Sequence, residues 1–97
     1  MQNDYLEQIN LDKITKISNY LNEKINACGL ESVTVSINSN IFSEKLEIYG
    51  VSVDLRNIKY DEKFENKTLD AAKEKIIKII KSNSFLNDVE VKFYEQN

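Results

Sequence analysis

Cys28 has the greatest intrinsic reactivity of any side chain in this sequence of 97 residues, which contains one cysteine and no histidine. A cysteine attacks as its thiolate, which a nearby base or positive charge must generate. Cys28 instead falls on an apolar stripe with Leu21 and Ile25, near the end of a predicted helix, where the helix dipole does not favour a thiolate. We therefore expect Cys28 to be a core residue, and a lone cysteine permits no internal disulfide.

Carboxylates are the other groups that could do chemistry, because the chain has 16 acidic residues. Asp54 could pair with Glu90 or Glu47 across a sheet as an acid and base couple, although chance produces such pairs on any solvated sheet face. The stretch DEKFE at 61–65 lacks the oxygen-ligand spacing of a calcium loop, and zinc would find no imidazole. Hence we predict no catalytic residue, no metal site and no cofactor, and we do not expect an enzyme.

The charge balance disfavours a nucleic-acid partner, and the hydropathy disfavours a membrane. The chain carries 13 basic residues and a net charge of −3, and Arg56 is the one arginine. A protein that binds phosphate backbones normally shows a basic patch, and glycines at 29 and 50 alone cannot form the GxxG clamp of KH domains. No apolar run approaches the ~20 residues that cross a bilayer, and no signal peptide opens the chain. We expect a soluble cytoplasmic domain with protein partners.

A first helix must position several of these groups. Apolar residues recur every three or four positions from Leu11 to Cys28, which is typical of an amphipathic helix. Asn10 is placed to cap its start, and Gly29 supplies the residue that ends it in a left-handed conformation. Residues 1–10 are predicted to be an N-terminal arm or an extra helical turn, and residues 11–97 a single α+β domain.

Two strands follow, and the second carries an unusual pattern. Residues 33–37 alternate between apolar and polar, and NSN at 38–40 favours a turn. In KLEIYGVSVDL at 45–55 the apolar positions change from even, at Leu46 and Ile48, to odd, at Val51 and Val53. A β-bulge at Tyr49–Gly50 would keep all of these apolar side chains on one face, because it inserts one extra residue into the strand. Glycine is a common bulge residue, since it tolerates the positive φ of many bulges. The alternative is a tight turn at Gly50 that divides the segment into two short strands.

The remaining elements complete an α-β-β-α-β order. A second helix is predicted over 68–82, with Thr68 or Asn66 as N-cap and Asn83 as C-cap, and a last strand over 89–94. The crossover through this helix suggests that the second and third strands are parallel and flank an antiparallel first strand. The predicted fold is a two-layer α/β sandwich in which both helices cover one face of a three-stranded mixed sheet.

Several apolar residues are left over once this core is assigned. Gathered into one patch, they would form a surface for a partner or for self-association, whereas the alternative is that they complete the core of a small domain. The segment 56–64 also extends past the expected end of its partner strand, and an overhanging edge can pair with another chain. The candidate partner-binding residues are Tyr20, Ile41, Phe42, Ile58, Tyr60 and Phe64.

The order and spacing of the elements resemble a known family. The segments LNEKINACGL, VTVSI, LEIYGVSVDL and VEVKFY, together with the lysine-rich second helix, resemble the KH-like, ring-building domains of bacterial secretion channels and stage III sporulation proteins. The resemblance implies a non-enzymatic subunit that associates side by side into a homo-oligomer. An alternative expectation is a small phage or mobile-element protein that binds and inhibits a host protein, since the abundance of Asn, Lys and Ile suggests an AT-rich bacterial or phage genome.

Overall fold

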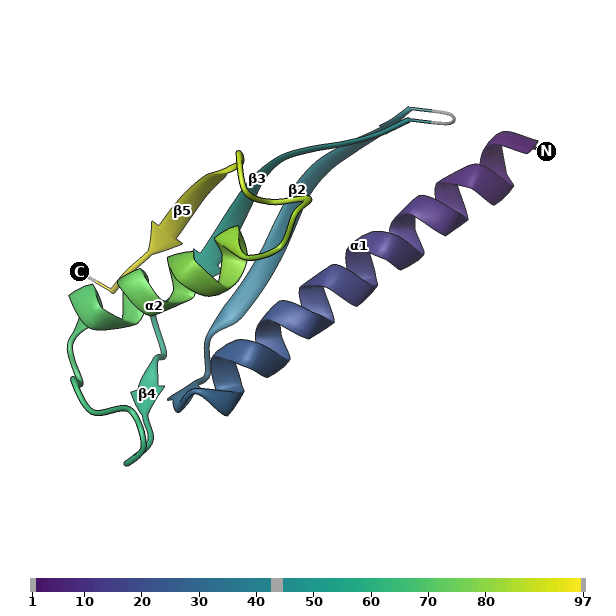
Figure 1. Cartoon of the computed structure of the whole chain (residues 1–97). Helices are drawn as coiled ribbons and strands as arrows, with labels where there is room; N and C mark the ends of the chain where they lie inside the picture. Colours follow the sequence, from purple (N-terminus) through teal and green to yellow (C-terminus); the bar gives the residue numbers. More distant parts are fainter. Residues whose placement is uncertain (1, 43–44, 97) are drawn as a thin grey trace.

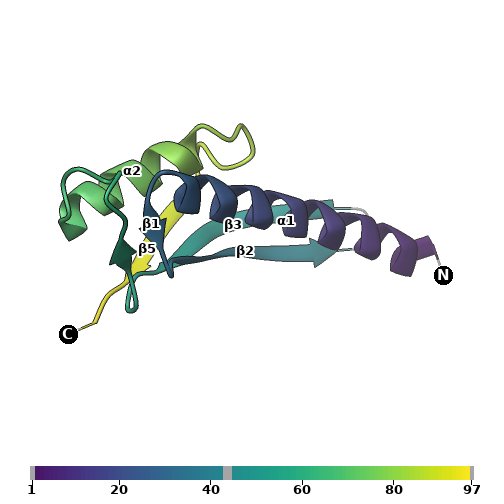
Figure 2. The same ribbon diagram turned by 90° about the horizontal axis from the view of Figure 1, so that it is seen from below.

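The computed structural model describes the backbone of residues 2–42 and 45–96, and the side chains of residues 8–40 and 46–96. The main elements are helix α1 (Gln2–Ala27), strands β2 (Thr34–Phe42) and β3 (Lys45–Asp54), helix α2 (Leu69–Lys81) and strand β5 (Glu90–Tyr94). Two further strands, β1 (Leu30–Glu31) and β4 (Lys59–Tyr60), pair with each other. The predicted α-β-β-α-β order is confirmed, and both helices lie on one side of the sheet (Figures 1 and 2).

Helix α1 begins much earlier than its sequence pattern predicted. It starts at Gln2, and Asn10 is an interior helical residue that is only 7% exposed, so the prediction of Asn10 as N-cap is wrong. Residues 2–10 contain neither glycine nor proline, and nothing in them stops the helix from extending toward the N-terminus. The predicted end is confirmed, because Gly29 follows the helix with φ +102°.

The bulge in β3 is confirmed, and the alternative of a turn at Gly50 is wrong. Asn38 pairs with Gly50 and Ser39 pairs with Ile48, which leaves Tyr49 as the extra residue. An extra residue restores the alternation of faces. Gly50, however, is not in a positive-φ conformation, so the predicted reason for a glycine at this position is wrong. The side chain of Tyr49 is 61% exposed.

The sheet is mixed as predicted, but its strand order differs from the prediction. The order is β2-β3-β5, with β3 antiparallel to β2 and parallel to β5, so the second strand rather than the first lies in the centre. The composition of the strands explains this order. Val51 and Val53 of β3 are fully buried, whereas β2 carries the polar run Asn38–Asn40 and suits an edge.

Helix α2 is held by the cap that its sequence predicted. The Thr68 hydroxyl accepts a hydrogen bond from the Ala71 amide at 3.2 Å, which satisfies a free donor of the first turn. The C-cap is Ser82 rather than the predicted Asn83. Between the helices and the sheet lies one hydrophobic core, formed by Leu21, Ile25, Leu30, Val35, Val51, Val53, Leu55, Phe64, Ala72, Ile76, Ile80 and Leu86.

Helix α1 is attached along the outer side of β2 by two side chains. The Val35 amide donates to Asn22 Oδ1 at 3.0 Å, and Ser18 Oγ donates to the Val35 carbonyl at 3.2 Å. These bonds occupy backbone groups that an edge strand would otherwise expose. They also fix α1 along the hairpin, and the chain is elongated, with extents of 49 × 23 × 22 Å. At the hairpin end of the molecule α1 continues beyond α2 and β5 (Figure 1).

Candidate partner-binding groove

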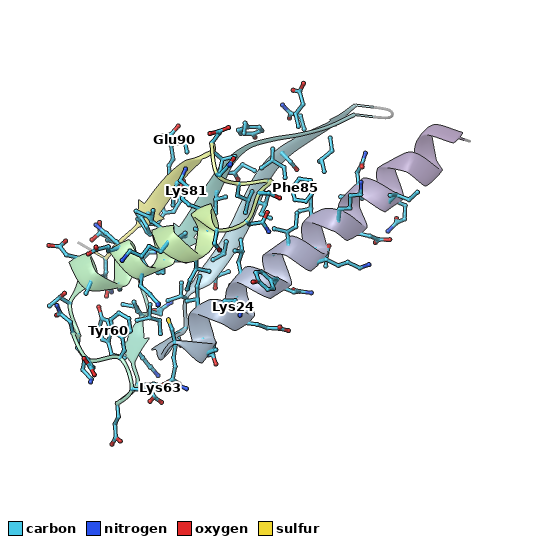
Figure 3. All side chains as sticks on the ribbon, viewed as in Figure 1. Lys24, Tyr60, Lys63, Lys81, Phe85 and Glu90 are labelled. Atoms are coloured by element: carbon cyan, nitrogen blue, oxygen red, sulfur yellow. The ribbon has the colours of Figure 1, made fainter. Side chains whose placement is uncertain are left out.

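A groove of about 500 Å³ opens where α1 and the hairpin extend past α2. One wall comes from α1, the floor from β3, and the end nearest α2 is formed by the loop 82–89, which carries Phe85 (Figure 3). The lining residues are Lys13, Lys16, Ile17, Leu46, Ile48 and Phe85. We call this site the α1–hairpin groove.

The floor of the groove is part of the core face of the sheet. The bulge at Tyr49 places Leu46 and Ile48 on the same face as the buried valines of β3. Helix α2 ends at Lys81, however, and of the described elements α1 alone covers the sheet at this end, so Leu46 and Ile48 stay half-buried. The result is an apolar surface inside an incomplete helical layer.

Local hydrogen bonds hold Phe85 at the end of this groove. The Phe85 amide donates to Asn83 Oδ1 at 2.9 Å, and the Leu86 amide donates to the Asn83 carbonyl at 3.0 Å. Lys81 Nζ closes the base of the loop by donating to the Val89 carbonyl at 2.5 Å. Leu86 is fully buried while Phe85 is 68% exposed, so the loop is anchored by one residue and presents the next.

A second, shallower hollow of about 350 Å³ adjoins the groove on the other side of Phe85. It shares Lys16, Ile17 and Phe85 with the groove and adds Tyr20 from α1, together with Ser82–Ser84. Tyr20 is 45% exposed, and Lys24 Nζ lies 5.5 Å from the centroid of its ring. Apolar and aromatic surface therefore continues along α1 from the groove toward Tyr20.

The charge of the groove is positive, although the protein as a whole carries a net charge of −3. Lys13 and Lys16 contribute to its lining, and among the side chains that the structure describes no carboxylate does. Neither lysine forms an ion pair or hydrogen bond with another residue of the described chain, whereas Lys73 pairs with Glu95 at 2.7 Å. Three positions apart on a helix, Lys13 and Lys16 point to the same side of α1.

Of the six candidate partner-binding residues, the four whose side chains the structure describes do not lie together. Tyr20 adjoins the groove, whereas the side chains of Ile41 and Phe42 lie outside the described residues. Phe64 belongs to the core, and Tyr60 packs against it with 5.9 Å between ring centroids. Ile58 also packs on the core. Ile58, Tyr60 and Phe64 therefore pack with the core, as the alternative interpretation described, because the pairing of β1 with β4 folds this segment back over the end of α1.

The groups considered for catalysis are engaged in other contacts. Cys28 is half-buried, and its thiol donates to the Ile25 carbonyl at 3.0 Å. Asp54 forms two hydrogen bonds with the Arg56 guanidinium, at 3.0 and 2.9 Å, and accepts a third from the Arg56 amide. These bonds, first those of the guanidinium, lower the pKa of Asp54 to about 2. Glu90 lies opposite Gly50 and Glu47 lies opposite Asn40, whereas Asp54 lies between Thr34 and Tyr94, so neither suggested acid and base couple is formed.

Comparison of the chain with protein-family models, with curated proteins and with solved structures gives no match. Within the described residues, no three or more acidic or cysteine side chains are arranged to hold a metal ion. Nor is either helix, over its described length, both long and apolar enough to cross a membrane.

Proposed function

We propose that this protein acts without catalysis, by binding a segment of another protein in the α1–hairpin groove. The observation that carries this proposal is the groove itself, where the strongly exposed Phe85 stands beside the uncovered core face of the hairpin. Aromatic side chains are enriched at the centres of protein interfaces, and a contiguous apolar patch next to a cationic rim is typical of a partner site.

The contacts of the reactive groups support a role without chemistry. The Cys28 thiol donates to the Ile25 carbonyl of α1, and no base among the described residues accepts a hydrogen bond from it, as activation of a nucleophile would need. Asp54 is held as a carboxylate by Arg56 and is therefore a poor proton donor near neutral pH.

The lysines favour a different protein over a second copy as the partner. In a two-fold symmetric dimer formed across the groove, the same patch of both copies would meet. Lys13 and Lys16 of both copies would then be brought into one interface, and like charges brought together oppose association. This argument supports the function of a small protein that binds another protein and blocks or recruits it.

A self-assembling structural subunit is the second candidate function. It is supported by strand β5, a five-residue edge strand with no neighbour on its outer side among the described residues. Edge strands can pair with a second chain, and side-by-side association is what the resemblance to ring-building domains implies. Light scattering separates the two candidates, because rings or large oligomers would favour assembly and a monomer would favour a heterologous partner.

Site-specific photo-crosslinking tests the first candidate. A photoreactive phenylalanine analogue replaces Phe85 in the protein, expressed in cells that carry its gene naturally, and replaces Tyr49 in a control. Tyr49 is comparably exposed but lies on the opposite face of the sheet. We expect a defined adduct from position 85 only, whose purified partner binds the wild-type protein and binds the Phe85→Asp variant at least about tenfold more weakly. Equal adducts from both positions, or none from position 85, would contradict the proposal.

A further inference from the structure

The shape and charge of the α1–hairpin groove identify the kind of segment that it fits. Resting on the proposed function, we propose that its occupant is a short amphipathic helix of a partner protein, with an apolar face against β3 and acidic residues along the flank that meets α1. Three features of the described residues support this: the gap in the helical layer, the orientation of the floor, and the lysines of α1.

The gap has the position that a helix of this fold would occupy. Helices α1 and α2 form one layer over the sheet, and at the hairpin end α1 is the one described element of that layer (Figures 1 and 2). A bound helix there would pack on α1 at the usual interaxial distance of about 8–10 Å and on the sheet from the same side as α2. The wall from Lys13 to Tyr20 spans about 10 Å along α1, which matches two turns of a partner helix.

The floor selects a helix over a strand. Leu46 and Ile48 present the face of the sheet, and not its edge, to the groove. An extended peptide on such a face would find no sheet hydrogen bonds, and burying its unpaired backbone groups against apolar side chains would be unfavourable. A helix satisfies its own backbone and can place apolar residues at i, i+3 or i+4, and i+7 on the floor and against Phe85.

The lysines determine the charge of the occupant. Lys13 and Lys16 stand about one helical turn apart on the groove side of α1, and neither has an ionic partner among the described residues. Carboxylates three or four residues apart on a bound helix would reach both ammonium groups. Since the rest of the protein is acidic overall, this local attraction distinguishes the groove from the remaining surface.

The test is a selection from a displayed library of two- to four-turn helical peptides whose flank positions are randomised. The library is selected against the wild-type protein, against the Lys13→Glu/Lys16→Glu variant, and against a Lys59→Glu/Lys75→Glu control. Lys59 and Lys75 are exposed and lie outside the groove, and each double variant changes the net charge equally, from −3 to −7, because two positive charges become two negative ones. Far-UV circular dichroism checks that all three proteins are folded.

We expect the wild type and the control to enrich peptides with Asp or Glu on one flank. The groove variant should bind those peptides about tenfold more weakly and should enrich Lys or Arg instead, and the binding by the wild type should weaken as salt rises. NMR shifts of the isotope-labelled protein with a selected peptide should centre on Ile17, Ile48 and Phe85.

Three outcomes would overturn the inference, and they differ in what they imply for the proposed function. Enrichment without a charge preference, or with lysine-rich flanks on the wild type, refutes the acidic flank but leaves a protein-binding groove. Enrichment of helix-breaking, extended sequences refutes the helix and leaves the same groove. If no peptide is enriched above background and position 85 gives no crosslinked partner, both the inference and the proposed function fail.

Discussion

The two glycines of this chain should respond very differently to alanine, because only one of them depends on lacking a side chain. Gly29 has φ +102°, a conformation that costs an L-residue about 1–2 kcal/mol. A Cβ at this position would also lie 3.0 Å from Lys63 Cγ and 3.1 Å from both the Cβ and the backbone nitrogen of Phe64. The lysine chain can move aside, but the backbone and the buried ring of Phe64 cannot do so freely.

The surroundings of Gly29 raise the expected loss further. The Asp61 amide donates to the Gly29 carbonyl at 2.8 Å, and the Phe64 amide donates to the Asp61 carbonyl at 3.0 Å, so the contact falls on a loop that is hydrogen-bonded to the helix end. Displacing a packed segment typically costs about 1–3 kcal/mol. The cost of the positive φ adds to the cost of displacing the loop, so we expect Gly29→Ala to lower the free energy of unfolding by about 3 kcal/mol.

Gly50→Ala should be close to neutral. Gly50 is not in the positive-φ region, and its added Cβ would lie 3.4 Å from the Glu90 carbonyl oxygen and 3.5 Å from Asn38 Nδ2, which are ordinary contacts. Alanine also reduces the entropy of the unfolded chain, which stabilises a compatible site by about 0.4–1 kcal/mol. The free energy of unfolding should therefore change by less than about 1 kcal/mol in either direction.

Urea unfolding followed by far-UV circular dichroism measures both variants. A domain of this kind is stable by about 5–15 kcal/mol, so Gly29→Ala should still fold and its loss should be measurable. Gly29→Asn provides a further comparison, because asparagine adopts positive φ more readily and should recover part of the cost of that conformation while keeping the close contact. The assignment of a strained turn to Gly29 alone would be refuted if Gly50→Ala lowered the free energy of unfolding as much as Gly29→Ala, or if Gly29→Ala did not lower it.

Three other predictions follow from the described contacts. Asn22→Ala should lower the free energy of unfolding by about 1–2 kcal/mol, because the β2 amide that it caps loses its acceptor. Tyr60→Asp should lower it by about 2 kcal/mol, because a carboxylate would replace a ring packed on Phe64. Arg56→Gln should raise the pKa of Asp54 from about 2 toward 3.8, as followed by carboxyl NMR. A lowered native pKa stabilises the fold above pH 3.8, and this contribution is lost as pH falls through about 2, so the variant should lack it.

Each of these predictions has a matched control. Asn19→Ala changes an exposed position of the same helix and should alter the free energy of unfolding by less than about 0.5 kcal/mol. If Asn19→Ala and Asn22→Ala lower it equally, the hydrogen bond from the Val35 amide to Asn22 is not the cause of the loss. Tyr49→Asp places the same charge on the open face of the sheet and should leave the free energy of unfolding nearly unchanged. If it lowers the free energy of unfolding as much as Tyr60→Asp does, the packing of Tyr60 on Phe64 is not the cause of the loss. Lys92→Gln removes a positive charge from β5 and should leave the pKa of Asp54 near 2, since the cause is Arg56.

Local patterns predicted what local physics determines. Thr68 caps α2 and Gly29 ends α1 because the chemistry of each lies within a few residues of the sequence. The bulge could be predicted for the same reason. When the alternation along β3 changes by one residue, inserting one extra residue keeps Leu46 and Val51 on one face without ending the strand. The order of helices and strands followed from these signals.

Features that depend on contacts between residues far apart in the sequence could not be predicted from these patterns. The strand order depends on which apolar strand is covered best, and alternation alone does not distinguish a central strand from an edge strand. The pairing of Leu30 with Tyr60 involves strands of two residues, too short for any periodicity, yet it buries Phe64 and removes it from the surface. Adjacent Phe85 and Leu86 carry equally apolar side chains, and only the folded loop decides which one is exposed.

The groove results from a mismatch in the lengths of the elements. Helix α1 has 26 residues and spans about 39 Å, whereas α2 has 13 residues and spans about 20 Å. The hairpin strands, of 9 and 10 residues, likewise exceed β5 with 5. If the extended end served only as a solvated arm, its core-facing positions would be expected to be polar. Instead Ile17, Leu46 and Ile48 keep the apolar pattern of the covered half, and Phe85 adds an aromatic ring beside them. A surface with the composition of a core, in an incomplete helical layer, is stabilised most by an occupant that completes the layer.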